Sequence, residues 1–281
     1  MNYPNMEHKI PVVVAGALGA MGSEAVKTII LAEDCTLVGA IDLIPEKQGS
    51  DIGLELGLNH QGVSITSDFE GCLCQVSQIA RNSASAVLID FTHPDVLYKH
   101  ARTAIAYGVH PVIGTTGITK ENLTNLIEFS RKAAIGGALV PNFSIGIVLL
   151  QQAAAAAARF YDFVELTELH HNLKADAPSG TCIKTAELIE ELDKSFNKST
   201  FEEYENLFGC RGGKRESGIR IHSVRLPGLI AHQEVLFGSH GETYTLRHDT
   251  IDRSAYMPGL MLVVRNVHRL QSLVYGLERL L

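Results

Sequence analysis

The stretch PVVVAGALGAMG, residues 11–22, decides the fold. A short β-branched run, Pro11 to Ala15, leads into a turn that carries Gly16, Gly19 and Gly22, and apolar residues recur at helical spacing after it. Glycines let such a turn tighten and let the backbone approach a pyrophosphate, which the N–H groups and dipole of the following helix favour. The stretch therefore predicts the strand, turn and helix of a dinucleotide-binding domain, with ordinary turn geometry as the alternative.

An acidic residue ends the second predicted strand. The apolar run Thr36 to Ile41 is followed by Asp42, 20 residues after the last glycine of the turn. An acid at that place binds the ribose hydroxyls of the adenosine. A 2′-phosphate would instead require Arg or Lys nearby, but Ala20 and Leu43 stand there and the nearest candidate is Lys47. These residues favour NADH over NADPH, or no strong preference.

Strand-like and helix-like stretches alternate through residues 11–141. Continuous apolar strands between amphipathic helices predict a parallel sheet that is covered on both faces. We therefore expect an α/β protein whose N-terminal domain, residues 1–141, is a Rossmann-type, doubly wound parallel sheet. The predicted strands are 11–15, 36–41, 86–91, 109–113 and 138–140, and the predicted helices are 21–32, 95–107 and one that begins at the N-cap Thr119.

The pattern changes after Pro141, and residues 142–250 predict an α+β domain with a mixed or antiparallel open sheet. Residues 197–217 are polar and glycine-bearing, which predicts a long loop with one short helix. Pro227-Gly228 and a second turn at 239–241 separate three β-rich runs, which predicts an antiparallel meander. The predicted elements are helices at 145–159 and 179–194, strands at 163–170, 219–226, 230–237 and 243–248, and a final helix at 256–281.

Three further turns follow predicted strands of the first domain. In an open parallel sheet, ligands bind at the carboxyl ends of the strands. The small, hydroxyl and amide residues of these turns suit a carboxamide or carboxylate ligand, although each turn alone is also compatible with ordinary loop chemistry. The turns are Phe91-Thr92-His93-Pro94, Gly114-Thr115-Thr116-Gly117 and Pro141-Asn142-Phe143-Ser144.

The segment ELHHNLKADAPSGT, residues 168–181, holds the densest chemistry in the chain. His170 and His171 adjoin each other, Lys174 is close, and a Pro-Ser-Gly-Thr turn enters a predicted helix. Hydroxyls and a glycine at a helix start suit an anion. Adjacent residues of a strand point to opposite faces, so both histidines address one ligand only if the strand ends there. The alternative is a pair of solvated loop histidines.

A metal site is not expected, because the chain has no His-Glu-x-x-His and lysine does not ligate zinc under these conditions. Cys182 follows the Ser-Gly-Thr turn and would be a nucleophile in a semialdehyde dehydrogenase, although one cysteine at a helix start is more often a packing residue. The five cysteines are scattered, with no Cys-x-x-Cys, which indicates free thiols in a reducing compartment.

The composition narrows the class of protein. A hydrophobic content of 46% excludes a disordered chain. A net charge of −7, from 24 basic and 31 acidic residues, excludes the overall basic footprint of a nucleic-acid-binding protein. No run approaches the ~20 apolar residues of a membrane span, and the start lacks the layout of a signal peptide. We therefore expect a cytoplasmic protein without nucleic-acid or membrane partners.

The motif H-H-x-x-K-x-D-A-P-S-G-T, from His170 to Thr181, resembles the signature of the dihydrodipicolinate reductase family. The glycine turn and the segments 90–94, 114–117 and 142–144 also match the family in order. The stretch RIHSVRLPGLIAHQEVLFG and the C-terminal region look like the family too, so the resemblance covers essentially the whole chain. The motif with the two histidines is highly specific, whereas the glycine turn is not.

The resemblance implies an activity, a cofactor and an assembly. The activity is the NAD(P)H-dependent reduction of a cyclic dicarboxylate, 4-hydroxy-tetrahydrodipicolinate or dihydrodipicolinate, to tetrahydrodipicolinate in the diaminopimelate route to lysine. Hydride passes from the nicotinamide of NADH or NADPH to ring C4, and the neighbouring carbon takes a proton. The resemblance further implies a homotetramer built through the C-terminal sheet, with the last helix, residues 251–281, packed on the nucleotide domain.

The resemblance also implies roles for individual residues. His170 would be the proton donor or acceptor and Lys174 the proton donor. The substrate carboxylates would be bound by His171, Ser179, Gly180, Thr181 and Thr116. The cofactor would be held by Gly16, Ala17, Leu18, Gly19, Ala20, Met21, Asp42, Phe91, Thr92, Gly114, Thr115, Thr116, Pro141, Asn142, Phe143 and Ser144.

The chain departs from the family at three positions and leaves two other functions open. Ala20 and Leu43 stand where members carry Lys or Arg, which bears on NADPH, and Leu173 replaces a residue that is often polar. One alternative is another two-domain oxidoreductase, such as a semialdehyde or sugar dehydrogenase, which would be sensitive to alkylation if it used Cys182. The other is a non-enzymatic nucleotide sensor, which would bind NADH without requiring Lys174.

Overall fold

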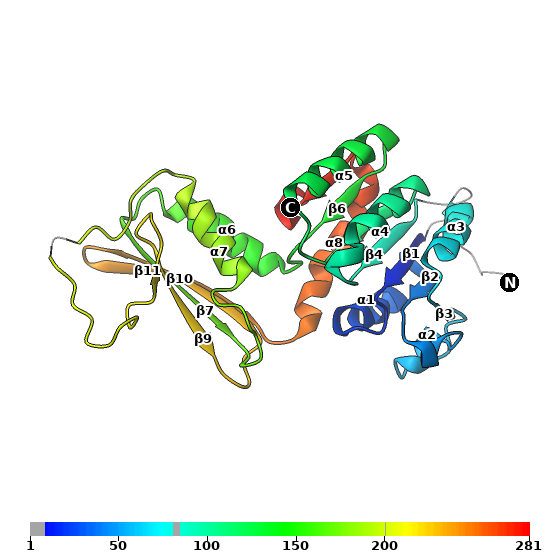
Figure 1. Ribbon diagram of the computed structural model, residues 1–281, viewed down its shortest axis with the longest axis horizontal. Helices are drawn as coiled ribbons and strands as arrows, with labels where there is room; N and C mark the ends of the chain where they lie inside the picture. Colours follow the sequence, from blue (N-terminus) through cyan, green and yellow to red (C-terminus); the bar gives the residue numbers. More distant parts are fainter. Residues whose placement is uncertain (1–8, 81–84, 200) are drawn as a thin grey trace. The chain divides into compact units, whose positions relative to one another are not determined.

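The computed structural model describes residues 9–80, 85–199 and 201–281 of the chain, which fold into two compact units (Figure 1). Unit 1 runs to Phe143 and also includes Tyr256–Leu281. Unit 2 is the continuous segment Ser144–Ala255. Each unit has its own sheet and its own helices.

Unit 1 contains a seven-stranded sheet in which every strand pair is parallel. The strand order β12-β6-β5-β4-β1-β2-β3 reverses its direction of growth between β1 and β4, as in a doubly wound sheet. The predicted Rossmann-type fold is therefore confirmed. The strands are β1 (Ile10–Ala15), β2 (Cys35–Ile41), β3 (Ile65–Thr66), β4 (Val87–Asp90), β5 (His110–Ile113), β6 (Gly137–Leu139) and β12 (Leu273–Tyr275).

Helices cover both faces of this sheet. Val12, Val13 and Val14 are all fully buried although successive residues of a strand point to opposite faces, so neither face of β1 is open to water. The α-helices of unit 1 are α1 (Ala20–Leu31), α2 (Ile52–Glu55), α3 (Phe69–Ala80), α4 (Pro94–Ala106), α5 (Lys120–Ala133) and α8 (Met257–Asn266), and the 3₁₀ turns are η1 (Pro45–Lys47), η2 (Arg253–Tyr256), η3 (Val267–Arg269) and η4 (Leu277–Arg279).

The predicted helix at 256–281 is wrong beyond its first turns. Helix α8 ends at Asn266, and the chain then extends so that Leu273–Tyr275 forms β12, paired in parallel with β6. Gly276 has φ +95, a left-handed conformation that cannot continue a helix of L-residues. Apolar residues at 270, 273, 274 and 277 fit a helical spacing, but a short apolar run fits a buried strand equally well.

Unit 2 contains a five-stranded sheet of order β11-β10-β7-β9-β8, packed against two helices on one face. Val164, Leu166, Val235 and Phe237 are at most 1% exposed on that face, where they meet the helices. The sheet is mixed, as expected. Its strands are β7 (Phe163–His170), β8 (Gly213–Lys214), β9 (Arg220–Arg225), β10 (Ala231–Ser239) and β11 (Glu242–Thr250), and the helices are α6 (Ile145–Ala157) and α7 (Gly180–Glu190).

The predicted antiparallel meander at 219–248 is only half right. Strands β10 and β11 form the expected hairpin, but β9 pairs in parallel with β7, which lies between β9 and β10. The connection of residues 226–230 crosses two strand spacings of about 4.8 Å each, a span that five residues bridge easily. The Pro-Gly pair thus begins a crossing connection, and the turn signal alone did not reveal which strand lies alongside β9.

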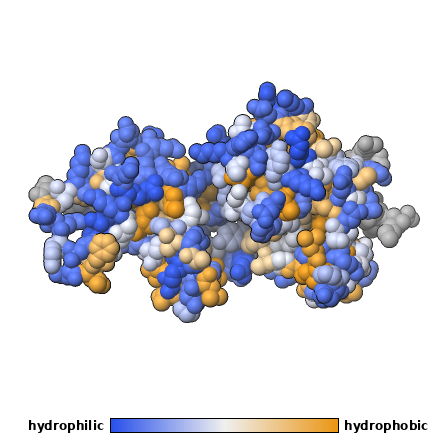
Figure 2. All heavy atoms as spheres, in the orientation of Figure 1, coloured by the Kyte–Doolittle hydropathy of each residue, from blue (hydrophilic) through white to orange (hydrophobic). Residues whose placement is uncertain are grey.

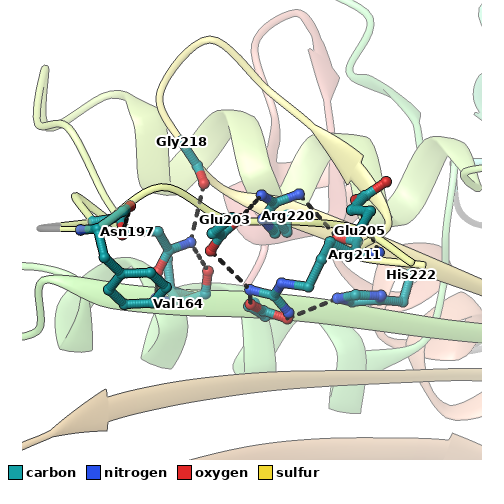
Figure 3. A network of polar contacts seen from close by, with 11 residues as sticks. Val164, Asn197, Glu203, Glu205, Arg211, Gly218, Arg220 and His222 are labelled. Carbon is teal, nitrogen blue, oxygen red and sulfur yellow. Dashed lines mark hydrogen bonds and ion pairs between the residues drawn. The ribbon is translucent and has the colours of Figure 1, made fainter. Parts of the chain in front are cut away.

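The segment 197–217 forms a loop that polar contacts hold against the sheet of unit 2 (Figure 3). The Asn197 side chain accepts a hydrogen bond from Val164 N at 2.9 Å and donates to Val164 O and Gly218 O at 2.7 and 3.0 Å. Farther along, Arg211 donates to Glu165 at 2.6 Å. The short helix predicted in this segment is absent from its described residues, which include only the two-residue strand β8.

The face of this sheet opposite the helices is mostly charged. Arg247 contacts Glu234 at 3.1 Å and Asp249 at 2.9 Å, and His232 contacts Asp249 at 2.7 Å. Leu236, whose position in β10 places it on the same face, is 40% exposed. Figure 2 shows one side of the whole molecule, with hydrophobic residues in patches among hydrophilic ones.

Candidate functional site

The glycine turn of unit 1 lies between β1 and α1 and requires its glycines. Gly16 has φ +74, and a Cβ on it would lie 2.7 Å from the Phe91 carbonyl oxygen. A Cβ on Gly22 would overlap the Gly16 carbonyl. Gly19 is the N-cap of α1, and no side chain caps that helix. The backbone at this helix start is therefore available to an anion, and the turn fits the pyrophosphate of a dinucleotide.

Asp42 lies beside the same turn, at the carboxyl end of β2. Its carboxylate accepts hydrogen bonds from Leu18 N at 2.9 Å and from its neighbour Leu43 N at 2.8 Å. These contacts fix the half-buried carboxylate next to the glycine turn, as a ribose ligand requires. Lys47, the nearest predicted partner for a 2′-phosphate, forms an ion pair with Glu55.

A buried carboxylate that the sequence reading missed holds the turn after β4. Asp90 is fully buried and accepts hydrogen bonds from Thr92 N at 2.8 Å and Thr92 Oγ1 at 2.6 Å. Its other oxygen contacts His100 Nδ1 at 2.8 Å, and Phe69 stacks on the His100 ring at 3.8 Å. The sequence does carry a signal for Asp90, because an acidic residue at the end of an apolar strand is unusual. Asp90 orients Thr92 at the edge of the sheet.

The other two turns at this edge are packed around aromatic rings. Phe91 and Phe143 meet edge to face, with ring centroids 5.8 Å apart, and a Cβ on Gly114 would collide with the Phe91 ring. Phe143 and Thr115 are buried, whereas Thr116 is exposed. Of the sixteen predicted cofactor residues, fifteen are in unit 1 at the turn and strand ends just described.

Ser144, the sixteenth, is the first residue of unit 2. Its hydroxyl caps α6 by accepting from Ile147 N at 3.4 Å, and it lies 3.1 Å from His248 Nε2. Burial lowers the pKa of His248, which favours its neutral ring. Ser144 therefore has a structural role at the start of α6 that the sequence reading did not foresee.

In unit 2, strand β7 ends at His170, which satisfies the condition under which both histidines address one ligand. His171 is exposed, and its carbonyl accepts a hydrogen bond from Lys174 N at 3.2 Å in a tight turn. The Lys174 ammonium lies 2.6 Å from Asp176, and this hydrogen bond lowers the pKa of the Asp176 carboxyl. The turn thus brings the side chains of His171, Lys174 and Asp176 to the end of β7.

The turn at 178–181 enters α7, with Ser179 as its N-cap. The Ser179 hydroxyl is buried and accepts from Cys182 N at 3.2 Å, so it serves the helix. Gly180 is exposed, and a Cβ added there would meet no atom within 4 Å. The backbone of Gly180 is consequently open to an anionic ligand at a helix N-terminus.

Behind His170 lies a buried ion pair that the sequence reading also missed. Glu168 is fully buried, its Oε2 contacts His170 Nδ1, and both its oxygens accept from Arg225, at 2.7 and 3.0 Å. Burial alone would raise the pKa of Glu168, but hydrogen bonds from His170, Arg225 and Ser223 outweigh it and lower that pKa to about 2. Glu168 is therefore ionised at neutral pH.

Cys182 does not fit the role of a nucleophile. It is fully buried in α7, and burial, reinforced by the charge of Glu168, raises the pKa of its thiol to about 12. Reactive cysteines have the opposite properties, since the thiolate is the nucleophile. Within residues 9–80, 85–199 and 201–281, no group of three or more His, Cys, Asp or Glu residues is arranged to hold a metal ion. In the same ranges, no helix is long and apolar enough to span a membrane.

Family models match both parts of the chain. "Dihydrodipicolinate reductase, N-terminus" matches residues 10–143, and "Dihydrodipicolinate reductase, C-terminus" matches residues 146–281. The chain belongs to the dihydrodipicolinate reductase family. The resemblance of the His-His-to-Ser-Gly-Thr motif to this family is thereby confirmed.

Curated relatives are similar over their full length. The "4-hydroxy-tetrahydrodipicolinate reductase" of Synechococcus sp. (strain CC9605) is 71% identical over 277 residues, which cover 98% of this chain and 100% of the relative. The protein of the same name from Synechococcus elongatus is 57% identical over 276 residues, again 98% of this chain and 100% of the relative. Such identity over both units extends the family relation to the whole chain.

One solved structure supports the same family, and a second shares the fold. A structure described as "Dipicolinate bound Dihydrodipicolinate reductase from Paenisporosarcina sp. TG-14" is 38% identical, with a TM-score of 0.82, and covers 97% of this chain and 100% of that one. An amine dehydrogenase from Mycobacterium smegmatis has a TM-score of 0.67 at 16% identity, covering 98% of this chain and 97% of that one. The second similarity concerns the fold alone.

The state of Cys182 predicts its resistance to alkylation. At pH 8 a thiol with a pKa of about 12 is ionised in about one molecule in 10⁴, and the side chain is shielded as well. We expect iodoacetamide to modify the exposed Cys210 and to leave Cys182 intact, as measured by peptide mass spectrometry. Labelled Cys210 serves as the internal control. Stoichiometric labelling of Cys182 in the folded protein would contradict the prediction.

Proposed function

We propose that the chain catalyses the NAD(P)H-dependent reduction of 4-hydroxy-tetrahydrodipicolinate, or dihydrodipicolinate, to tetrahydrodipicolinate in lysine biosynthesis. The observation that carries the proposal is the grouping of His170, Lys174 and the open start of α7 at the end of β7. The names of the curated relatives and the dipicolinate bound to a family member support it. A coupled assay with dihydrodipicolinate synthase, comparing NADH and NADPH oxidation, tests it.

The chemistry of the substrate explains why these groups are needed. A cyclic dicarboxylate carries two negative charges, which cations and N–H donors stabilise. His171, Lys174 and the backbone at Gly180 and Thr181 would bind the carboxylates. The family resemblance adds Ser179 and Thr116 to the proposed set. The dicarboxylate is thus held through its charges, which leaves the ring carbons to react.

Residues at the end of β7 would supply the proton that the substrate ring needs. When bound, the nicotinamide supplies the hydride to ring C4. From the 4-hydroxy substrate, the C4 hydroxyl and a hydrogen of the neighbouring carbon first leave as water, which gives the dihydro ring. Hydride addition to that ring leaves negative charge on the neighbouring carbon, which must receive a proton. In the proposal Lys174 donates that proton and His170 donates or accepts one in the same reaction. Asp176 holds the Lys174 ammonium in place by a hydrogen bond of 2.6 Å.

We propose NADH as the cofactor, with NADPH as the alternative. Asp42 beside the glycine turn suits a ribose 2′-hydroxyl and repels a 2′-phosphate. Neither Ala20 nor Leu43 offers a cation, and Lys47 is paired with Glu55. A cytoplasmic location also belongs to the proposal, because five unpaired cysteines suit a reducing compartment.

Substitution of the two proton-transferring residues tests the mechanism. We expect Lys174→Ala and His170→Ala each to lower kcat by on the order of 10² or more, because each removes an acid–base group. NADH affinity, measured by fluorescence titration, should be unchanged because the glycine turn belongs to unit 1. His240→Ala, an exposed histidine in the β10–β11 turn, is the matched control. Unchanged turnover in both variants would contradict the mechanism.

The cofactor assignment has its own test. We expect Asp42→Ala to weaken NADH binding by about tenfold, or ~1.4 kcal/mol, and to weaken NADPH less, since the lost carboxylate repels the 2′-phosphate. Glu46→Ala, a nearby exposed acid, should change neither affinity. A preference of the unmodified protein for NADPH above about tenfold would show that another basic residue serves the phosphate.

We propose further that the chain forms a homotetramer through the unit 2 sheet, with a dimer as the alternative. The exposed Leu236, and Phe163 at 50% exposure, belong to the sheet face away from the helices and suit a copy of the same surface. In sedimentation at micromolar concentration, Leu236→Lys should lower the associated fraction, and Leu31→Lys, an exposed leucine of unit 1, should not. A single 30.5 kDa species in the unmodified protein would contradict this assembly.

A further inference from the structure

Glu168 is an unusual acid within unit 2. Its side chain is fully buried, yet it lies only two residues before His170 on the same strand, and alternation places both side chains on one face of β7. Its Oε2 contacts His170 Nδ1, and the His170 side chain is 14% exposed. The Nδ1 side of the imidazole thus contacts the Glu168 carboxylate, and the ring is only partly exposed to solvent.

Arg225 fixes Glu168 from the neighbouring strand. Its two terminal nitrogens donate to the two carboxylate oxygens at 3.0 and 2.7 Å, a bidentate pair. The same guanidinium also donates to Val224 O at 2.8 Å and Asp176 O at 2.7 Å. The parallel register of β7 and β9 sets His170 opposite Arg225 and thereby builds this contact. Removal of the Arg225 charge would leave the buried Glu168 carboxylate without its cationic partner.

The protonation state of Glu168 determines which ring nitrogen of His170 carries a hydrogen. An ionised carboxylate only accepts hydrogen bonds, so the nitrogen that faces it must be an N–H. The hydrogen bonds from His170, Arg225 and Ser223 overcome the burial that would raise the pKa of Glu168 and hold it at about 2, so the carboxylate is ionised throughout the neutral range. His170 Nδ1 therefore carries a hydrogen in both the neutral and the charged ring, and only Nε2 gains or loses a proton.

We propose that Glu168, clamped by Arg225, is the positioning residue that holds His170 with its hydrogen on Nδ1 and reserves Nε2 for proton exchange with the substrate. This inference rests on the proposed function of His170. Carboxylate partners orient histidine in the same way in metal sites and catalytic triads. Arg225 balances the charge of Glu168 and keeps the carboxylate in place.

Few charged residues other than Arg225 lie near the His170–Glu168 pair. On β9, Arg225 is the charged residue in contact, and Ser223 hydrogen-bonds Glu168. On β10, Ala231 and Gln233 lie opposite His170 and Glu168 and carry no charge. On α7, Cys182 is held as a neutral thiol. The turn after β7 adds the Lys174–Asp176 pair, whose opposite charges are 2.6 Å apart. Glu168 is thus the dominant electrostatic partner of the His170 ring.

The same strand offers a matched control. Glu165 is also on β7 and also contacts an arginine and a histidine, Arg211 at 2.6 Å and His222 at 2.7 Å. An odd number of positions separates Glu165 from Glu168, so it points to the opposite face of the sheet. Glu165→Gln therefore removes the same kind of carboxylate from the same strand without touching His170.

The experiment compares Glu168→Gln with Glu165→Gln by nitrogen NMR and by kinetics. In ¹⁵N-histidine-labelled protein without substrate, at a pH where the ring is neutral, His170 should carry its hydrogen on Nδ1. Its signals are assigned from their loss in His170→Asn. Glu168→Gln should mix the two ring forms, lower kcat by about 10-fold to 100-fold, and leave the KM for NADH unchanged.

The pH profile supplies a readout that a merely structural role would not move. Loss of the carboxylate removes the negative charge that contacts the ring, so the limb of the kcat profile that reports His170 should change position in Glu168→Gln. Glu165→Gln should leave the His170 signals, kcat and this limb as they are. An Nε2-bound hydrogen in the unmodified protein, or an unmoved limb with full kcat in folded Glu168→Gln, would overturn the proposal.

Two provisions keep the outcome decisive. If Glu168→Gln does not fold, the NMR measurement on the unmodified protein still tests the position of the hydrogen, and Glu168→Gln combined with Arg225→Gln removes the unpaired charge. The NMR measurement needs no substrate, so it also separates two kinds of failure. Hydrogen on Nδ1 without any NADH or NADPH oxidation in the coupled assay would refute the proposed function, whereas activity with hydrogen on Nε2 would refute the positioning role alone.

Discussion

Parallel strand pairing is the constraint on which the chemistry of both units depends. Parallel neighbours end at the same edge, so in unit 1 the glycine turn, Asp42, Thr92 and the turn at 114–117 all lie along one edge of the sheet. In unit 2, the parallel pairing of β7 with β9 sets His170 beside Arg225. An antiparallel β9 would carry Arg225 to the opposite end of β7. Strand direction therefore decides which side chains can act together.

Much of unit 1 could be predicted because its signals are local. The glycine turn after a β-branched run fixed β1 and α1, and the N-cap Thr119 marked the start of α5. Strands buried on both faces show as continuous apolar runs, which is why β2, β4 and β5 were found at nearly their observed bounds. The helices between residues 43 and 85 were not predicted, and α2 at four residues is too short to show a period.

The unpredicted features depend on contacts between residues far apart in the sequence. Glu168 and Arg225 are 57 positions apart, and nothing in either local segment indicates the other. Asp90 and His100 are closer, but their contact depends on how α4 packs against β4. The final strand is a similar case, because Leu273 and Val274 are strand residues only where β6 offers a free edge. Sequence patterns predict elements, whereas pairing partners follow from tertiary structure.

The order of the elements along the chain has a consequence for synthesis. Unit 2 is inserted into unit 1. Strand β12 completes the unit 1 sheet by pairing with β6, and the paired residues Leu273 and Gly137 are 136 positions apart in the sequence. During translation all of unit 2 is made before that last strand exists. Until then β6 is a sheet edge with unpaired backbone groups, a surface that other chains can join. The nascent protein must therefore keep this edge protected while the inserted unit is made, and early release of the chain would leave the edge permanently open.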